Sequence, residues 1–212
     1  MDRGYNNSYE YYMSIALGLA KKGEGAVNPN PLVGAVVVKN GEIVGKGYHK
    51  FYGGPHAEVY ALEEAGEKAL GADIYVSLEP CSHYGKTPPC VEAIIKAGIK
   101  RVIISMEDPN PLVAGRGINF LREKGVEVIT GVLENEAKKL NEIFIKYITR
   151  KIPFVILKTA MTIDGKISTY TGESKWISGE ESREYVHKIR NKVMGIMVGI
   201  GTVIADDPLL TT

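Results

Sequence analysis

The chain has little of several features that would narrow its function at once. Only two of its 212 residues are cysteine, which excludes a secreted scaffold held by several disulfides. An excess of one charge sign is also missing, since the formal net charge is +1, and this gives no general attraction for nucleic acid or membranes. No apolar run has transmembrane length, and no signal-peptide pattern opens the chain. We therefore expect a cytoplasmic protein that binds neither nucleic acid nor membrane. A small-molecule substrate and a homo-oligomeric state are expected as well.

What the chain does contain, along residues 1–150, is the element order of an α/β domain. Two apolar runs at 32–38 and 43–48 flank an Asn-Gly turn, which predicts a β-hairpin. Apolar periodicity predicts the other elements, which are helices at 9–22, 56–65, 88–97, 117–124 and 134–148 and strands at 73–78, 101–105 and 126–130. A hairpin followed by alternating helices and strands predicts a three-layer α/β/α domain with a mixed sheet.

Residues 151–212 form a second predicted unit. Strands are expected at 154–159 and 194–198, with a helix at 179–191 between them. The roughly 60 residues of this unit are fewer than the about 100 that an independent α/β domain usually needs. We therefore expect an incomplete second domain.

The strongest chemical signal is the sequence His-Ala-Glu at 56–58, followed by Cys81 and Cys90. One imidazole and two thiols make a zinc donor set that leaves a fourth position open for water. H-x-E followed by P-C and a second cysteine is the signature of zinc-dependent nucleobase deaminases. In such a site Glu58 is expected to move protons between water and substrate without binding the metal.

The predicted elements bring these three donors to one place. His56 is expected in the first turn of its helix and Cys90 in the first turn of another, where the helix N-terminus favours a thiolate. Cys81 is expected at the end of a buried strand. Strand end and helix starts would meet at the carboxyl edge of the sheet, where α/β proteins place their sites.

Several alternatives remain open from the residues alone. A closed structural zinc site needs a fourth ligand, and His49 and His83 are both available. The donors could also be an unmetallated His with two reduced thiols, or belong to a zinc-stabilised scaffold without catalysis. A deaminase of another base, such as tRNA adenosine or cytosine, is less consistent with the charge balance and with eight residues between the cysteines.

Four longer motifs carry a resemblance to a known family. EPCSHYGKTPPC, NPNPLVGAVVV, GGPHAEVYAL and DPNPLVAGRG resemble the bifunctional riboflavin-biosynthesis deaminase/reductase. The resemblance implies a cytidine-deaminase-like domain over 1–150 that hydrolytically deaminates 2,5-diamino-6-ribosylamino-4(3H)-pyrimidinone 5′-phosphate to 5-amino-6-(5-phosphoribosylamino)uracil. It implies that 151–212 begins a dihydrofolate-reductase-like α/β domain, which in the family uses NADPH to reduce the ribosyl to a ribityl group.

The resemblance also implies roles for single residues. It assigns zinc to His56, Cys81 and Cys90 and proton transfer to Glu58. It assigns the deaminase substrate to a set of polar side chains in loops, which are Asn30, His49, Lys86, Asp108 and Asn110. From the residues alone, Lys86 could equally be a solvated lysine, His49 an exposed strand end, and the Asx-Pro pairs ordinary turn initiators.

For the second unit, the resemblance implies two further residue sets. Those that contact NADP are Ala160, Trp176, Thr202 and Asp206, and those that contact the sugar phosphate are Lys158, Ser174, Arg190 and Leu210. Arg190 could instead be a solvated helix residue and Trp176 a core aromatic. Because the second domain is expected to be incomplete, or to serve only as an oligomerisation surface, we expect the chain to deaminate without reducing.

Overall fold

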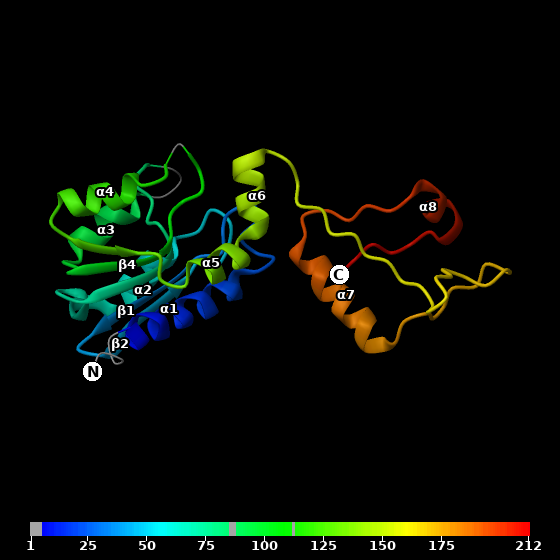
Figure 1. Cartoon of the computed structure of the whole chain (residues 1–212), viewed down its shortest axis with the longest axis horizontal. Coiled ribbons are helices and arrows are strands. Elements are labelled where there is room, and N and C mark those ends of the chain that lie inside the picture. The colour runs from blue at the N-terminus through cyan, green and yellow to red at the C-terminus, as the bar shows by residue number, and fades with distance from the viewer. Residues whose placement is uncertain (1–5, 85–87, 112) are drawn as a thin grey trace. The chain divides into compact units, whose positions relative to one another are not determined.

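A computed structural model describes residues 6–84, 88–111 and 113–212 of the protein (Figure 1). The chain divides into two compact units, Met1–Phe154 and Val155–Thr212. None of the helices within the described ranges combines the length and the apolar character needed to cross a membrane.

A five-stranded sheet forms the centre of the first unit. Its strands are β1 (Gly34–Lys39), β2 (Glu42–Tyr48), β3 (Asp73–Leu78), β4 (Arg101–Met106) and β5 (Glu127–Thr130). They lie in the order β2-β1-β3-β4-β5, with β1 antiparallel to both neighbours and the β3-β4 and β4-β5 pairs parallel. The expected mixed sheet is confirmed.

The predicted hairpin turn between β1 and β2 is also present. Asn40 and Gly41 have φ angles of 51° and 81°, so both central residues adopt the left-handed conformation that a two-residue type I′ turn needs. Asn and Gly are the residues that enter this region at least cost, which is why the sequence identified the turn.

Helices cover both faces of the sheet (Figure 1). On one face lie α1 (Asn6–Ala20) and α5 (Glu134–Leu140), and on the other lie α2 (Ala57–Ala65), α3 (Cys90–Lys96) and α4 (Arg116–Glu123). Val36 and Ile103 pack toward α1, whereas Val37 and Ile104 pack toward α2 and α3, following the two-residue alternation of strands. This is the expected α/β/α layering, completed by the short 3-10 helices η1 (Lys21–Gly23) and η2 (Gly66–Ala69).

Helix α2 can lie close to β2 because two glycines of this strand face it. A Cβ atom on Gly47 would lie 2.1 Å from the Ala57 carbonyl oxygen, and one on Gly45 would lie 2.1 Å from that of Ala61. Both distances are far below any normal contact. The glycines therefore set the height of α2, whose N-cap is His56, above the sheet.

The prediction of a single long helix at 134–148 is wrong. The segment forms α5 and a second helix, α6 (Glu142–Arg150), separated at Asn141. The buried Asn141 side chain accepts a hydrogen bond from the Leu32 N–H at 2.8 Å and donates one to the Leu32 carbonyl at 3.0 Å. This paired contact with another loop is a tertiary interaction that helical periodicity does not report.

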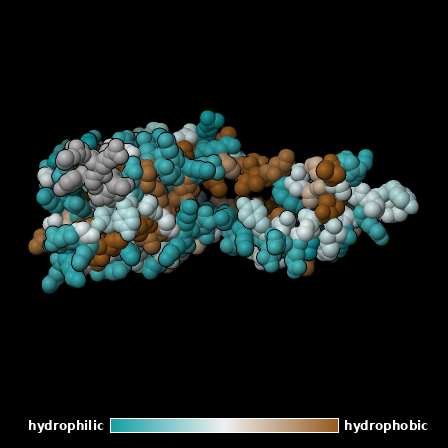
Figure 2. Space-filling view, turned by 60° about the horizontal axis from the view of Figure 1, so that its bottom comes forward, coloured by the Kyte–Doolittle hydropathy of each residue, from teal (hydrophilic) through white to brown (hydrophobic). Residues whose placement is uncertain are grey.

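The second unit contains helices α7 (Glu180–Lys192) and α8 (Ile200–Asp206). The predicted helix at 179–191 is confirmed as α7, but the strands predicted at 154–159 and 194–198 are wrong, because no strand forms anywhere in 155–212, a range the structure describes throughout. Apolar side chains such as Leu157, Tyr170 and Met197 remain exposed there, and hydrophobic surface is visible over this unit in Figure 2. Strand formation depends on a neighbouring strand, which this segment lacks.

Candidate metal centre and adjoining pocket

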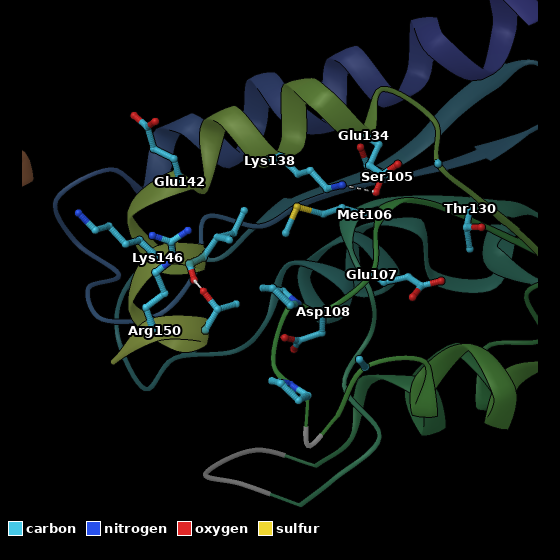
Figure 3. Close-up of a pocket in the computed structure, with 16 residues that line it drawn as sticks. Ser105, Met106, Glu107, Asp108, Thr130, Glu134, Lys138, Glu142, Lys146 and Arg150 are labelled. Atoms are coloured by element: carbon cyan, nitrogen blue, oxygen red, sulfur yellow. Dashed lines mark hydrogen bonds and ion pairs between the residues drawn. The ribbon is translucent and has the colours of Figure 1, made fainter. Parts of the chain in front are cut away.

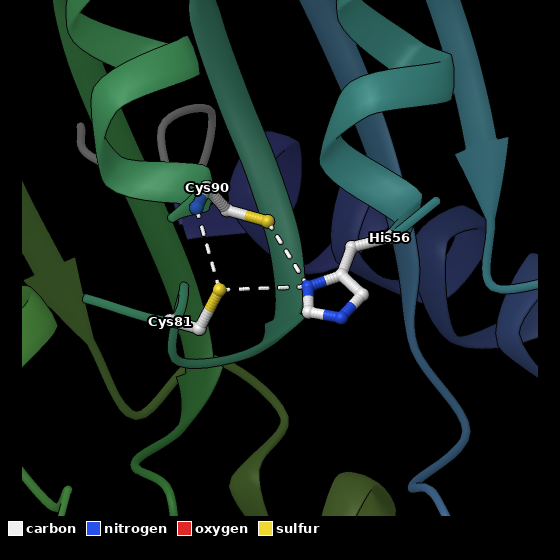
Figure 4. A group of neighbouring side chains, drawn as sticks. All are labelled: His56, Cys81 and Cys90. Atoms are coloured by element: carbon white, nitrogen blue, oxygen red, sulfur yellow. Dashed lines mark hydrogen bonds between the residues drawn. The ribbon is translucent and has the colours of Figure 1, made fainter. Parts of the chain in front are cut away.

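Three donor side chains meet where β3, α2 and α3 present their ends (Figure 4). His56 is the N-cap of α2, Cys90 is the first residue of α3, and Cys81 lies three residues beyond the end of β3 rather than at the strand end. Nδ1 of His56 is 3.2 Å from Sγ of Cys90 and 3.5 Å from Sγ of Cys81. The structure thus brings together the donor set predicted from the sequence.

The spacing of these donors fits zinc. Tetrahedral zinc with ordinary Zn–N and Zn–S bonds separates its nitrogen and sulfur ligands by about 3.6 Å. The three ligand atoms all lie within 4.8 Å of one another. Within the part of the chain that the structure describes, these residues form the one group of side chains suited to hold a metal ion. His49 is not part of this group, and the cysteines are free thiols rather than a disulfide. A three-donor set leaves a coordination position for water.

The electrostatics of the thiols suit a cation. The hydrogen bond from the Cys90 thiol lowers the pKa of Cys81 to about 4, aided by His56 and by the Cys90 backbone N–H, 3.3 Å from the sulfur. The same interaction raises the pKa of Cys90, and burial raises it further. The hydrogen bond with Cys81 raises the pKa of His56. One thiolate is therefore already favoured by the protein, and a dication would favour the second.

Glu58 lies in the first turn of α2 and is only 3% exposed. Burial raises the pKa of its carboxyl to about 7, with the charge of His56 opposing the rise. A carboxyl with a pKa close to neutral can accept and return a proton at working pH. Glu58 is outside the three-residue donor group.

Asn30 and His49 form one wall beside the donor group. Nδ2 of Asn30 lies 3.1 Å from Nε2 of His49, and the His49 ring lies 5.6 Å from the His56 ring, edge to face. His49 is 3% exposed, so the alternative of an exposed strand end is wrong. Burial lowers its pKa, which favours the neutral imidazole.

Asp108 and Asn110 lie in the loop that follows β4. The Asp108 carboxylate accepts the backbone N–H of Asn110 at 2.8 Å, an Asx-turn contact, so the turn chemistry weighed from the sequence is real. Burial raises the pKa of Asp108. Lys86, the fifth member of the predicted substrate set, lies outside the described residues.

A cleft of about 970 Å³ opens on the Asp108 side of the sheet edge (Figure 3). It runs between the ends of β4 and β5 and helices α5 and α6, and Asp108 lines it together with Lys138, Lys146 and Arg150. Acidic residues share the wall, and Glu134 pairs with Lys138 at 2.7 Å. The cleft therefore offers charges of both signs next to a residue expected to bind substrate.

Two buried polar residues around the site were missed from the sequence. Glu79 is 6% exposed and accepts backbone hydrogen bonds from the loop after β4, and Asn141 holds Leu32 beside the Asn30 loop. The signal available in the sequence for Glu79 was its position immediately before the Pro80-Cys81 pair. Asn141 gave none, because an Asn within an amphipathic pattern normally faces solvent.

The residues implied for the second unit are spread over its loops and helices. Thr202 and Asp206 lie one turn apart on α8, and Arg190 of α7 donates to the Thr211 carbonyl at 3.2 Å, next to Leu210. Trp176 is 68% exposed with the Arg183 guanidinium 4.3 Å above its ring, so it is no core aromatic. The remaining members are mostly exposed loop residues, namely Lys158, Ala160 and Ser174.

A mixed sheet between helix layers, with a His/Cys/Cys donor set and a buried glutamate at one edge, defines the class of zinc-dependent deaminases of the cytidine deaminase type. Residues 6–106 match the cytidine and deoxycytidylate deaminase zinc-binding region. Residues 153–212 match the RibD C-terminal domain. The chain belongs to the RibD family of riboflavin biosynthesis proteins.

Relatives match along nearly the whole chain. It is 58% identical over 200 residues to riboflavin biosynthesis protein RibD of Aquifex aeolicus, covering 94% of the chain and 56% of that protein. For RibD of Escherichia coli the identity is 50% over 202 residues, which cover 95% of the chain and 55% of that protein. The chain thus spans about half the length of the curated relatives it matches.

Solved structures of relatives agree. A RibD structure from Acinetobacter baumannii superposes with a TM-score of 0.93 at 48% identity, covering 97% of this chain and 58% of that one. A diaminohydroxyphosphoribosylaminopyrimidine deaminase/5-amino-6-(5-phosphoribosylamino)uracil reductase from Thermotoga maritima gives 0.90 at 53% identity, covering 96% and 59%. The dihydrofolate-reductase-like region expected after residue 150 rests on the family match, since 155–212 forms two helices and no strand.

Proposed function

We propose that the domain over residues 1–150 catalyses the hydrolytic deamination of 2,5-diamino-6-ribosylamino-4(3H)-pyrimidinone 5′-phosphate, releasing ammonia and 5-amino-6-(5-phosphoribosylamino)uracil. The observation that carries the proposal is the three-donor set with a buried glutamate beside it. The activity in the name of the Thermotoga maritima relative supports the choice of substrate.

His56, Cys81 and Cys90 would hold the zinc. When bound, the zinc supplies Lewis acidity that makes a water nucleophilic near neutral pH. Glu58 would take one proton from the attacking water and deliver it to the ring nitrogen, and would then take the remaining hydroxyl proton and deliver it to the leaving amine, so that the C–N bond breaks and ammonia leaves. Its pKa of about 7 suits both directions of transfer. Burial of Glu58 excludes bulk water, so the proton goes to the substrate.

The pyrimidine edge would be recognised by the loops around the metal centre. Asn30 and His49 offer an amide and a neutral imidazole from one side, and Asp108 and Asn110 offer an acceptor and an amide from the other. Lys86 would contribute a cation for the phosphate or the ring carbonyl. The cleft beside Asp108 gives room for the ribosyl phosphate, with Lys146 and Arg150 as further cations on its wall.

We also propose that residues 151–212 belong to the NADPH-dependent reductase part of the family. The NADP set would be Ala160, Trp176, Thr202 and Asp206, and the sugar-phosphate set would be Lys158, Ser174, Arg190 and Leu210. The segment by itself has no sheet and exposes many of its apolar side chains. We expect residues 1–212 to deaminate without oxidising NADPH, and NADPH oxidation measured with the deaminated product tests this. Homo-oligomer formation remains a prediction.

The decisive experiment measures ammonia release from the diaminopyrimidine ribosyl phosphate by purified, zinc-loaded protein. Glu58→Gln should abolish release while one zinc per chain remains. Glu63→Gln, an exposed glutamate of the same helix, should keep full activity. Ammonia release that survives in Glu58→Gln contradicts the proton-transfer role of Glu58. A zinc-loaded wild-type protein that releases no ammonia contradicts the substrate assignment. Cytosine and adenine nucleosides are then the next substrates to assay.

A further inference from the structure

The Glu79 carboxylate lies outside the metal-donor group and accepts hydrogen bonds from four backbone N–H groups. Its Oε1 accepts the N–H groups of Gly117 at 2.8 Å and Ile118 at 3.3 Å. Its Oε2 accepts those of Asp108 at 3.1 Å and Gly115 at 3.0 Å. Each oxygen therefore holds two donors, one pair from the first turn of α4 and the other from the loop before it.

A second observation shows that α4 is fitted against this carboxylate. A Cβ atom on Gly117 would lie 2.1 Å from the Pro80 carbonyl oxygen and 3.2 Å from Oε1 of Glu79. Only glycine allows such an approach. The first N–H groups of a helix have no partners within the helix, and here Glu79 supplies them.

These contacts join the segment that carries Cys81 to the loop expected to bind substrate. Glu79 lies two residues before Cys81, and its own N–H donates to the Met106 carbonyl at the end of β4 at 3.0 Å. Asp108, held through its N–H, in turn holds Asn110 through its carboxylate. A continuous chain of hydrogen bonds thus runs from the segment that carries Cys81 to the loop that carries Asp108 and Asn110.

We propose that Glu79 is a positioning residue of the deaminase, which sets the distance between the metal centre and the Asp108–Asn110 wall of the pocket. The assignment of that wall to substrate rests on the function proposed above. Glutamine at position 79 keeps the shape but replaces one accepting oxygen with a donating NH₂ group, which faces two N–H donors. Two of the four hydrogen bonds are then lost, either those to Asp108 and Gly115 or those to the first turn of α4, and the wall is held less tightly while the three zinc donors stay.

The experiment compares Glu79→Gln with Glu64→Gln in the 212-residue chain. Glu64 is a matched control, because its carboxylate also accepts a backbone N–H, that of Lys46 at 3.0 Å, but on an exposed face. Measured are zinc per chain, amide hydrogen exchange by NMR, and kcat and KM for ammonia release. In Glu79→Gln we expect about tenfold faster exchange at two or more of the four held amides and a KM raised about tenfold, with kcat within about threefold and one zinc retained.

Two outcomes overturn the proposal. In the first, the exchange rates of the four amides and the KM of Glu79→Gln equal those of Glu64→Gln. In the second, Glu79→Gln loses zinc and kcat while KM is unchanged, which would mean that Glu79 supports only the metal centre. If Glu79→Gln fails to fold, Gly117→Ala decides instead, because displacing α4 from Glu79 should produce the same rise in exchange and KM. A wild-type chain that binds zinc and releases no ammonia contradicts the proposed function, and the exchange rates still decide whether Glu79 holds the loop.

Discussion

Nδ2 of Asn30 lies 3.1 Å from Nε2 of His49, and this contact fixes which ring nitrogen of the histidine carries the proton. The other nitrogen, Nδ1, lies 3.0 Å from the carbonyl oxygen of Pro55, which can only accept. Nδ1 is therefore protonated and donates, while Nε2 accepts from the amide. The imidazole is neutral, in keeping with the lowering of its pKa by burial.

Replacing the amide should reverse this preference. In Asn30→Asp a carboxylate faces Nε2, which favours the imidazolium, so the pKa of His49 should rise by about one unit. NMR titration of the imidazole measures it. Asn119→Asp, at an exposed position of α4, should leave the pKa of His49 unchanged. A pKa in Asn30→Asp equal to that of the wild type would mean that Asn30 does not face the ring in solution.

Zinc should stabilise the first unit by binding only its folded state. At free zinc about 1,000 times the dissociation constant, the gain is about 4 kcal/mol. Chelation should therefore lower Tm, and Cys81→Ser should remove the dependence on zinc. His83→Ala is the control, since His83 is an exposed histidine outside the donor group. A Tm that falls equally on chelation in wild type and Cys81→Ser would place the stabilising metal elsewhere.

Glu58 predicts a pH dependence for the zinc-free protein. Its pKa is raised from 4.5 to about 7, so the folded state binds the proton more tightly than the unfolded state. The associated stability, about 3 kcal/mol, is fully present below pH 4.5 and is lost as pH rises through 7. Urea unfolding between pH 5 and 8 should show a larger loss in wild type and in Glu63→Gln than in Glu58→Gln, in which other groups with raised pKa, among them His56 and Asp108, still contribute. Parallel curves for Glu58→Gln and wild type would contradict the raised pKa.

Asn141→Ala should destabilise the first unit by about 1–3 kcal/mol, because both backbone groups of Leu32 lose their partner in a partly buried setting. Asn135→Ala, an exposed change within α5, should cost well under 1 kcal/mol. Urea unfolding gives both values. Equal effects would show that the Leu32 groups find water instead.

Two glycine-to-alanine changes should alter the stability of the first unit in opposite directions. At Gly47 the new methyl group would meet the Ala57 carbonyl at 2.1 Å, so α2 must move and stability should fall by about 1–3 kcal/mol. At Gly18, within α1, nothing lies within 4 Å, and the gain in helix propensity should stabilise by about 0.5–1 kcal/mol. Thermal unfolding of the two variants checks the signs.

Local chemistry explains what the sequence predicted well. The Asn-Gly turn, the β-branched runs and the Pro-Pro pair before Cys90 each specify a conformation through neighbours in the chain. The zinc donors were found because metal chemistry restricts both residue type and number. The turn, the strands and the helix start are specified within a few residues, whereas His56 and Cys90 lie 34 residues apart and were identified by residue type alone.

The features that were wrong or missed depend on distant partners. Asn141 divides a helix because of Leu32, more than one hundred residues away in the chain. Glu79 meets donors from the start of α4, and the predicted strand at 154–159 has no neighbouring strand. His49 is buried rather than exposed, and its ring contacts Asn30 and the ring of His56. None of these partners is visible in a window of local sequence.

The direction of β1 has a consequence for how specificity can change. Because β1 runs opposite to β3, and β2 opposite to β1, the start of β1 and the end of β2 lie at the same sheet edge as the end of β3. The hairpin therefore delivers Asn30 and His49 to the metal centre as one contiguous stretch of chain, while His56, Cys81 and Cys90 come from other segments. Exchanging this hairpin between related proteins would replace Asn30 and His49 together and leave the metal ligands untouched, so under the proposed function it is a unit for redesigning base preference.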